Sequence, residues 1–198
     1  MKQFAPSCDR NKDEILAVLQ EIFPPSGVVL EIGSGTGQHA VYFAARLPHL
    51  IWQPTDLEQN LPSIRAWCAE ANQQNLRAPL ELDLLCEHWP VATASAVVCI
   101  NTTHIVSSPG VENLLAGVGR VLAPGGVLYV YGAYRYATRV LEPSNEEFDR
   151  WLKARDPASG VRDFEAVNAL AQRNGLQLTE DRAMPGNNRS IWWTKAAS

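Results

Sequence analysis

Residue types and patterns that mark several protein classes are scarce or missing in this sequence of 198 residues. Cysteine occurs four times, and no two cysteines have the spacing of a metal site or a redox pair, so we expect reduced thiols in a cytoplasmic protein. No apolar run reaches the length of a membrane span, and residues 1–10 lack the pattern of a signal peptide. Basic runs are missing too and the net charge is −4, which disfavours a nucleic-acid partner.

The most informative stretch is residues 28–47, where an apolar strand leads into a glycine-rich turn and then into a helix. Gly33, Gly35 and Gly37 stand at the first, third and fifth positions of the turn. A dinucleotide-binding fingerprint has its third glycine at the sixth position, which here is Gln38. Glycine lets the backbone approach a ligand closely, and the free N–H groups of the following helix point to the same place. The turn therefore predicts a nucleotide-like ligand, with a tight turn made only for packing as the alternative.

Segments with the patterns of strands and helices alternate through most of the chain. A helix is predicted from an N-cap at Asp9 to Ile22. Strands are then predicted at 28–32, 49–53, 79–83, 96–101 and 127–131, with helices at 40–47, 62–75 and 109–122. Helices at 144–153, with Ser144 and Glu147 as a capping box, and at 163–174 precede two antiparallel strands at 176–184 and 190–194. The sequence therefore predicts one α/β domain over residues 1–198, with a mostly parallel sheet covered by helices on both faces.

Short motifs spread over nearly the whole chain resemble one known family. They are Arg10-Asn11-Lys12, residues 33–39, Trp52-Gln53-Pro54, Cys99-Ile100-Asn101 with His104, Pro143-Ser144-Asn145 with Phe148-Asp149, Val161-Arg162-Asp163 and residues 184–188. The family is an uncharacterised, methyltransferase-like domain-of-unknown-function family, which is itself similar to the class I S-adenosylmethionine (SAM) methyltransferases. The resemblance implies their Rossmann-like seven-stranded sheet, SAM as cofactor with S-adenosylhomocysteine (SAH) as product, and no metal. Thr102 and Ala133 depart from the family pattern, which has Met and Pro at these positions.

The expected cofactor residues follow the carboxyl ends of the parallel strands, where open sheets of this kind bind ligands. The backbone of Gly33, Ser34, Gly35 and Gly37 would pass under the methionine part of SAM. Asp56 lies 23 residues after Gly33 (56 − 33), close to the offset of about 20 residues at which ribose-binding acids occur. A carboxylate can accept hydrogen bonds from both ribose hydroxyls, although Asp is also a common helix N-cap.

The resemblance implies further cofactor residues on three strands. Asp83 and Leu84, after the third strand, would lie at the adenine, with a simple turn as the alternative for Asp83. Asn101, at the end of the fourth strand, would lie beside the amino group of SAM. Glu31 would help to hold that end through hydrogen bonds, and it needs polar partners to stay charged because its strand is apolar.

Four residues are candidates for the chemistry of methyl transfer. His104, just past the fourth strand, has the side-chain pKa of a general base, with a purely structural histidine as the alternative. Asn187 and Asn188 lie between the last two strands and are expected to face the methyl group from the other side, unless they only form the turn. Tyr134, after the fifth strand, would orient an acceptor or form a wall of its pocket.

Two segments are expected to cover the acceptor. One is residues 1–25, an arm and a helix, and the other is an insertion at residues 143–160 that would act as a lid. The residues expected to contact the acceptor from these segments are Arg10, Asn11, Phe148 and Trp151. His39, in the first turn of the helix after the glycines, would line the pocket as a neutral group or serve in packing, since the helix dipole disfavours its charged form.

Together these features predict a SAM-dependent methyltransferase that acts on O, S or N of a small molecule. The alternatives are a methyltransferase with a protein or RNA acceptor, a non-catalytic SAM-binding module and, least favoured, a dinucleotide oxidoreductase. Residues 101–104 read Asn-Thr-Thr-His and lack the Asn/Asp-Pro-Pro-Tyr/Phe pattern of enzymes that methylate planar amines, which disfavours such acceptors. No acidic cluster has metal-ligand spacing, so metal-assisted transfer is not expected. The oligomeric state does not follow from the sequence.

Overall fold

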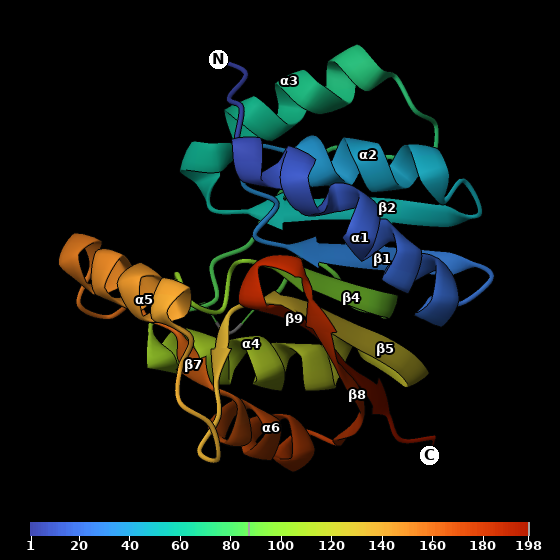
Figure 1. The fold of residues 1–198 in the computed structure, drawn as a ribbon. Helices are drawn as coiled ribbons and strands as arrows, with labels where there is room; N and C mark the ends of the chain where they lie inside the picture. Colours follow the sequence, from blue (N-terminus) through green and yellow to red (C-terminus); the bar gives the residue numbers. More distant parts are fainter. Residues whose placement is uncertain (87, 198) are drawn as a thin grey trace.

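The computed structural model describes residues 1–86 and 88–197, in which a seven-stranded sheet carries helices on both faces (Figure 1). Its strands are β1 (Gly27–Ile32), β2 (Leu50–Asp56), β3 (Leu80–Glu81), β4 (Ala94–Ile100), β5 (Leu122–Gly132), β8 (Leu176–Met184) and β9 (Asn188–Lys195). The order across the sheet is β3-β2-β1-β4-β5-β9-β8. The first five strands in this order are parallel, and β9 runs antiparallel to both β5 and β8. The sheet confirms the predicted fold, a Rossmann-like sheet that ends in an antiparallel pair.

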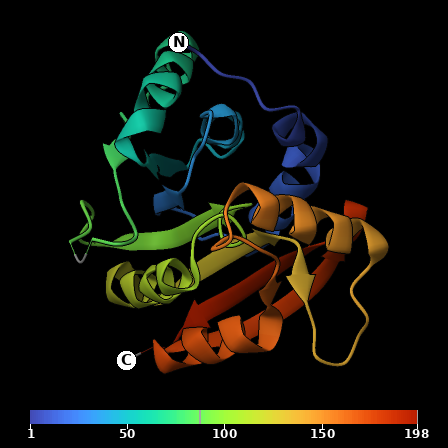
Figure 2. The same cartoon turned by 90° about the vertical axis from the view of Figure 1, so that its left-hand side faces the viewer.

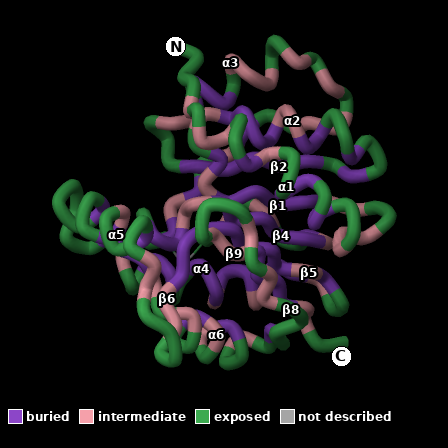
Figure 3. Tube along the Cα trace, viewed as in Figure 1, coloured by how far each residue is buried: buried purple, intermediate pink, exposed green. Residues whose placement is uncertain are grey.

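Helices cover the two faces of the sheet as separate layers. They are α1 (Pro6–Ile22), α2 (Gln38–Arg46), α3 (Leu61–Ala71), α4 (Ser108–Val121), α5 (Pro143–Arg155) and α6 (Phe164–Arg173), with short 3-10 turns η1 (Glu58–Asn60) and η2 (Pro185–Asn187). Apolar side chains of α1 and α2 pack on one face around Phe43 and Trp52, and those of α4 and α6 pack on the other face around Trp193. Buried residues follow the strands and the inner turns of these helices (Figure 3). No helix within the described part of the chain is long and apolar enough to cross a membrane.

The central strand β4 shows how the sequence produces this layered arrangement. Ala96, Val98 and Ile100 belong to the apolar cluster with α1 and α2, whereas Val97 and Cys99 belong to the cluster with α4 and α6. Because both faces of a central parallel strand are covered, the strand needs an almost continuous apolar run instead of an alternating pattern. The prediction of a buried parallel strand here is confirmed.

Some element boundaries differ from the sequence prediction. α1 begins at Pro6, because proline suits a first-turn position whose N–H would have no helical partner. Asp9, which was predicted to be the N-cap, therefore lies inside the first turn. The third strand was expected over residues 79–83 but is only Leu80–Glu81. The chain turns away at Asp83, whose Oδ1 accepts a hydrogen bond from the N–H of Leu85 at 2.8 Å.

The insertion after β5 contains α5, which stands beside the carboxyl ends of the strands (Figure 1). The predicted capping box is wrong, because α5 begins at Pro143 and Glu142 occupies the N-cap. Ser144 Oγ instead accepts a hydrogen bond from Asn187 Nδ2 at 2.9 Å, which ties the start of α5 to η2. β6 (Tyr134–Arg135), before α5, pairs in parallel with β7 (Arg162–Asp163), which follows α5 and leads into α6. The sequence did not predict this two-stranded sheet.

Candidate functional site

Two cavities adjoin at the end of the sheet where β1, β2 and β4 finish, the end that faces the viewer in Figure 2. The first has a volume of about 550 Å³ and is bounded by the glycine turn, the loops after β2, β3 and β4, and the first turn of α1. The second has a volume of about 650 Å³ and lies between α1 and α5. Ser7, Asn101 and Ile105 line both cavities, so molecules bound in the two would be neighbours.

The glycine turn forms one wall of the first cavity. Gly37 has a φ of +96°, and a Cβ on it would lie 2.9 Å from the Cα of Ile64, so the close packing of α2 against α3 requires glycine there. Gly35 has a φ of +59°, and nothing lies within 4 Å of the place where its Cβ would be. Gly35 also lines the cavity, so its backbone is open to a ligand. The turn therefore serves packing at Gly37 and leaves room for a ligand at Gly35.

Asp56 ends β2 with its carboxylate turned toward the glycine turn. Its Oδ2 accepts a hydrogen bond from the N–H of Gly35 at 2.6 Å. Its Oδ1 accepts from the N–H of Leu57 at 2.7 Å and from Asn60 Nδ2 at 2.8 Å. The side chain is buried and lines the first cavity. The structure therefore brings Asp56 and the glycine turn together, as their spacing in the sequence predicted.

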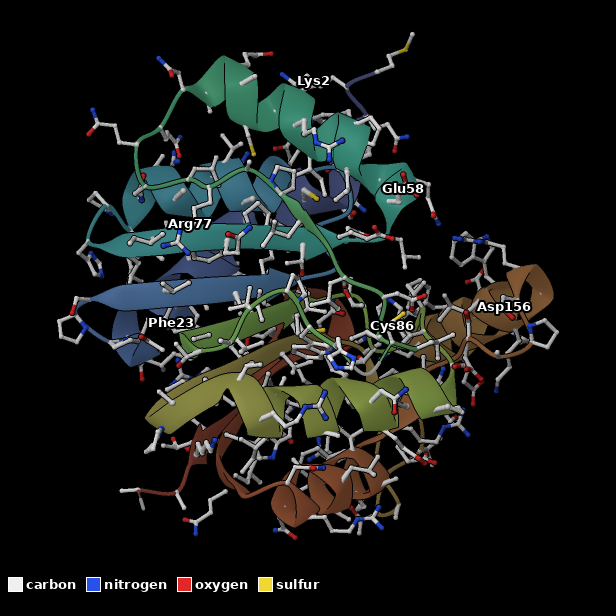
Figure 4. The ribbon with its side chains drawn as sticks, turned by 180° about the vertical axis from the view of Figure 1, so that it is seen from behind. Lys2, Phe23, Glu58, Arg77, Cys86 and Asp156 are labelled. Atoms are coloured by element: carbon white, nitrogen blue, oxygen red, sulfur yellow. The ribbon has the colours of Figure 1, made fainter. Side chains whose placement is uncertain are left out.

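Most of the predicted cofactor residues line the first cavity. They are Gly33, Ser34, Gly35, Asp56, Asp83, Leu84 and Asn101, and His39 lines it as well. Glu31 and Gly37 do not. Glu58, Cys86 and Asp156, labelled in Figure 4, lie in or next to three of the segments around this cavity, seen there from behind. Asp83 lines the cavity, and its side chain also forms the turn that was the alternative expectation.

Glu31 lies beneath the turn, inside the sheet. Its Oε2 accepts a hydrogen bond from Trp52 Nε1 at 2.9 Å. Burial raises the pKa of this carboxyl group to about 7, and hydrogen bonds from Trp52 and Ser34 act in the opposite direction. The polar partners that the sequence called for are therefore present, but Glu31 supports the turn from below and does not reach the cavity.

Asn101 lies where the two cavities adjoin. Its backbone has a φ of +55°, a left-handed conformation that asparagine adopts more readily than most non-glycine residues. Its N–H donates to the carbonyl of Tyr131 at 2.8 Å, which fixes this kink at the end of β4. Asn101 therefore occupies a fixed kink at the junction of both cavities.

The second cavity is built from segments far apart in the sequence. Its lining residues are Ser7, Arg10, Asn11, Glu14, Asn101, His104, Ile105, Tyr131, Ala133, Ser144, Asn145, Phe148, Trp151, Arg155, Pro185, Gly186 and Asn188. All four residues predicted to contact an acceptor from α1 and from α5 are among them. The two positions that depart from the family pattern also lie in cavity walls, Thr102 in the first cavity and Ala133 in the second.

His104 lines the second cavity as a neutral ring. Burial lowers its pKa to about 4, and the charge of Arg162 acts in the same direction. The ring packs edge-on against Phe148 with 4.9 Å between the ring centres, and its Nδ1 has no hydrogen-bond partner among the described residues. A histidine with this pKa is a weak base at neutral pH, which disfavours the general-base role predicted from the sequence.

His39 is held in place by its neighbours on both sides. Its Nε2 donates to Asn11 Oδ1 at 2.8 Å, and its ring stacks on Phe43 with the ring centres 5.3 Å apart. Burial lowers its pKa to about 4. His39 is thus the neutral group that was expected, it lines the first cavity, and it links α2 to the start of α1.

The remaining candidates for the chemistry have different surroundings. Asn188 lines the second cavity. Asn187 lines neither cavity and joins η2 to α5, since its carbonyl accepts a hydrogen bond from Asn145 Nδ2 at 3.0 Å and its side chain bonds Ser144. Tyr134 is buried in the core, lies 3.2 Å from Thr103 through its hydroxyl, and also lines neither cavity. The structure therefore does not bring Tyr134 to the acceptor side.

Arg162 organises the loop after β4, a role that the sequence did not indicate. Its guanidinium group donates to the carbonyls of Thr103 at 3.1 Å and Ala158 at 2.7 Å, and also to the carbonyl of Val106. These bonds join the end of the insertion to the loop that carries Asn101 and contributes to both cavities. The motif around Arg162 was visible in the sequence, but long-range bonds to backbone carbonyls leave no pattern in it.

Comparison with known proteins identifies the family. Residues 2–195 match the family described as "Protein of unknown function (DUF938)". The chain belongs to this family. The match extends over almost the whole sequence, which confirms the resemblance that the short motifs indicated.

Solved structures with the same fold are methyltransferases. An O-methyltransferase family protein from Burkholderia thailandensis matches with a TM-score of 0.84 and 16% identity, over 97% of this chain and 58% of that one. Human N-acetylserotonin methyltransferase, in complex with SAM, matches with a TM-score of 0.78 and 16% identity, over 96% and 53%. An O-methyltransferase family 2 protein from Planctomyces limnophilus, in complex with apigenin, matches with a TM-score of 0.78 and 15% identity, over 96% and 60%. The likeness establishes the methyltransferase fold, and the chain spans less than two thirds of the length of each of these proteins.

Proposed function

We propose that this DUF938 chain is a SAM-dependent methyltransferase that transfers a methyl group to O, S or N of a small molecule. The observation that carries the proposal is the junction of two cavities at Asn101, one of them lined by the glycine turn and Asp56. Holding two reactants next to each other is the main requirement of this reaction. The methyltransferase fold supports the same proposal.

The residues of the first cavity fit SAM. Gly35 leaves open space for a ligand beside the backbone, and the buried carboxylate of Asp56 can accept hydrogen bonds from ribose hydroxyls. Asp83 would lie at the adenine and Asn101 at the methionine end. When bound, SAM supplies a methyl group on a positively charged sulfur, which is already electrophilic. The main task left to the protein is to hold the acceptor in line with that methyl group.

The second cavity has the properties of a small-molecule site. Its volume of about 650 Å³ falls within the range of about 300–1,000 Å³ that is typical of ligand pockets. We propose that His104 positions the acceptor as a neutral group, because its lowered pKa makes it a poor base. Asn188 would offer amide hydrogen bonds to the same acceptor, and Asn187 would act only through its bonds to α5.

The first prediction tests the cofactor assignment. Asp56→Asn removes the charge that would receive the ribose hydroxyls, so the affinity for SAM and SAH should fall about tenfold to hundredfold, from a loss of roughly 1–3 kcal/mol. Titration calorimetry measures this loss directly. Glu58→Gln is the matched control, since Glu58 lies nearby in η1 but does not line the cavity. An unchanged affinity in a folded Asp56→Asn protein would refute the proposed site.

A further inference from the structure

The second cavity is a slot between one face of α1 and one face of α5. Residues three or four apart on a helix share a face, and the lining residues follow this spacing on both helices. Those of α1 are Ser7, Arg10, Asn11 and Glu14, and those of α5 are Ser144, Asn145, Phe148, Trp151 and Arg155. The turn at residues 185–188 closes one end of the slot, and His104 and Asn101 lie at its inner side, toward the sheet.

The charged residues that line this slot are Arg10, Arg155 and Glu14, and the excess of positive charge favours an anionic ligand. Arg10 contributes a guanidinium group from α1, and Arg155 contributes another from α5. Neither lies within 4 Å of a carboxylate among the described residues, so both are free to bind a ligand oxygen. Arg155 lies over the ring of Trp151, 4.9 Å from its centre, which limits its orientation. Arginine is the side chain best matched to a planar carboxylate, because its N–H groups form a fork.

The uncharged lining fits the rest of such a ligand. Phe148 and Trp151 stack with 6.0 Å between ring centres and 15° between ring planes, and Trp151 is 51% exposed. They form an apolar wall for the body of an acceptor. Asn11 uses its carboxamide oxygen for His39, so its amide N–H groups are left to donate to a ligand oxygen, whereas the amide groups of Asn145 and Asn188 already donate to backbone carbonyls. The slot thus combines an apolar surface with hydrogen-bond donors.

The slot also offers no strong base beside the first cavity to remove a proton from an acceptor. His104 is neutral at physiological pH and a weak base. Burial raises the pKa of the Tyr131 hydroxyl, which keeps it protonated. Glu14 lies two helical turns from Ser7, the α1 residue that lines both cavities, a distance of about 10 Å along the helix. An acceptor that is already ionised at neutral pH needs no such base, and carboxylates are ionised at this pH.

Resting on the function proposed above, we infer that the acceptor is a small carboxylic acid with an apolar body, held by Arg10 and Arg155, and that its carboxylate oxygen receives the methyl group. In this step an oxygen–carbon bond forms as the carbon–sulfur bond of the sulfonium breaks. The electron pair of the broken bond stays on the sulfur. The products are a methyl ester and SAH, and no proton is transferred.

The experiment uses SAM that carries a deuterated methyl group and the low-molecular-mass fraction of a cell extract, separated by anion exchange into retained acids and unretained compounds. Mass spectrometry should find the label in a product made from the retained acids. Mild alkali should release this label as deuterated methanol, because esters hydrolyse and ethers, thioethers and methylamines do not. Label that resists alkali would overturn the carboxylate inference and leave the proposed methyltransferase intact. A folded protein that binds SAM and labels nothing would overturn both.

Variants connect the result to the slot. Arg10→Gln and Arg155→Gln should each raise the KM for the labelled acid about tenfold, the effect of losing one charged hydrogen bond, and leave the affinity for SAM unchanged. Arg150→Gln is the matched control, because Arg150 is exposed on the same helix and does not line the slot. Equilibrium dialysis of the SAH-loaded protein against the retained acids adds a readout without turnover, and it should enrich the same acid with wild type but not with the double variant. Equal enrichment by both proteins would overturn the role of the two arginines.

Discussion

Glu31 places a carboxyl group inside the sheet, on the strand that leads into the glycine turn. Folding changes the protonation of this group, because burial raises its pKa from 4.5 to about 7. The hydrogen bond from Trp52 only partly offsets the loss of water around it. A residue that lies beneath the glycine turn therefore also makes the stability of the protein depend on pH.

Glu31→Gln should remove this dependence. Between about pH 4.5 and pH 7 the folded chain holds a proton that the unfolded chain has released, so the free energy of unfolding falls as the pH rises through this window. The fall should be on the order of 3 kcal/mol in wild type relative to the variant. Urea unfolding of both proteins at about pH 5 and about pH 8 measures it. Folding lowers the pKa values of His39 and His104, so these two residues reduce the free energy of unfolding as the pH falls. The reduction is the same in both proteins and cancels in the comparison. Identical pH dependence in the two proteins would contradict the assignment.

At the residue scale, the sequence predicted positions better than side-chain directions. The glycine turn and Asp56 were predictable because their spacing follows from a strand, a turn and a helix of ordinary length. Tyr134 was not, because the backbone after a strand leaves the direction of the next side chains open, and this one enters the core next to Thr103. The pKa of His104 depends on burial by segments far away in the chain, which no local pattern contains.

At the element scale, α5 is fixed at both ends. Its first turn is bonded to η2 through Asn145 and Asn187, and the segment after it is bonded to the loop after β4, where the N–H of Gly160 donates to the carbonyl of His104 at 2.9 Å. Ser159 Oγ also donates to the carbonyl of Ile105 at 2.6 Å. If residues 143–160 act as a lid, as the sequence suggested, the hydrogen bonds at these two anchors hold the lid in place, and they must break for it to move.

Asn187→Gly tests the first anchor. Glycine tolerates the φ of +58° at this position, so the variant loses the side-chain bond to Ser144 without backbone strain. The loss of about 1 kcal/mol should speed amide hydrogen exchange in the first turns of α5 about fivefold. Exchange in residues 156–160 should stay unchanged, and Thr179→Ala on the exposed strand β8 serves as the control. Uniform acceleration over the whole insertion would mean that the two anchors are not independent.

The elements themselves show where sequence patterns suffice. The buried strand β4, Ala94–Ile100, was predicted at residues 96–101 because its apolar run follows directly from burial on both faces. The capping box of α5 was predicted wrongly, since Ser144 bonds a residue more than forty positions away instead of capping its own helix. The short strands β6 and β7 were missed because two paired residues leave no periodicity to detect.

At the scale of the whole molecule, one sheet separates two apolar clusters, one with Trp52 and one with Trp193. Alternate residues of the same strands belong to both clusters, so neither cluster can come apart without the sheet. We predict that residues 1–198 unfold as a single domain. Unfolding in urea, followed by circular dichroism and by tryptophan fluorescence, should give coincident transitions. Trp52→Phe and Trp193→Phe remove one reporter each and should each retain that coincidence, whereas two separated transitions would show two independent units.

The division of the two cavities between segments has a consequence for how this protein can change over evolution. The first cavity is built mainly on the parallel half of the sheet and its loops, whereas the second takes most of its walls from α1, α5 and the turn at residues 185–188. Under the proposed function, substitutions on α5 would therefore alter which acceptor is bound without disturbing the glycine turn or Asp56. A designer who wishes to redirect such a protein would have a single helix on which to begin.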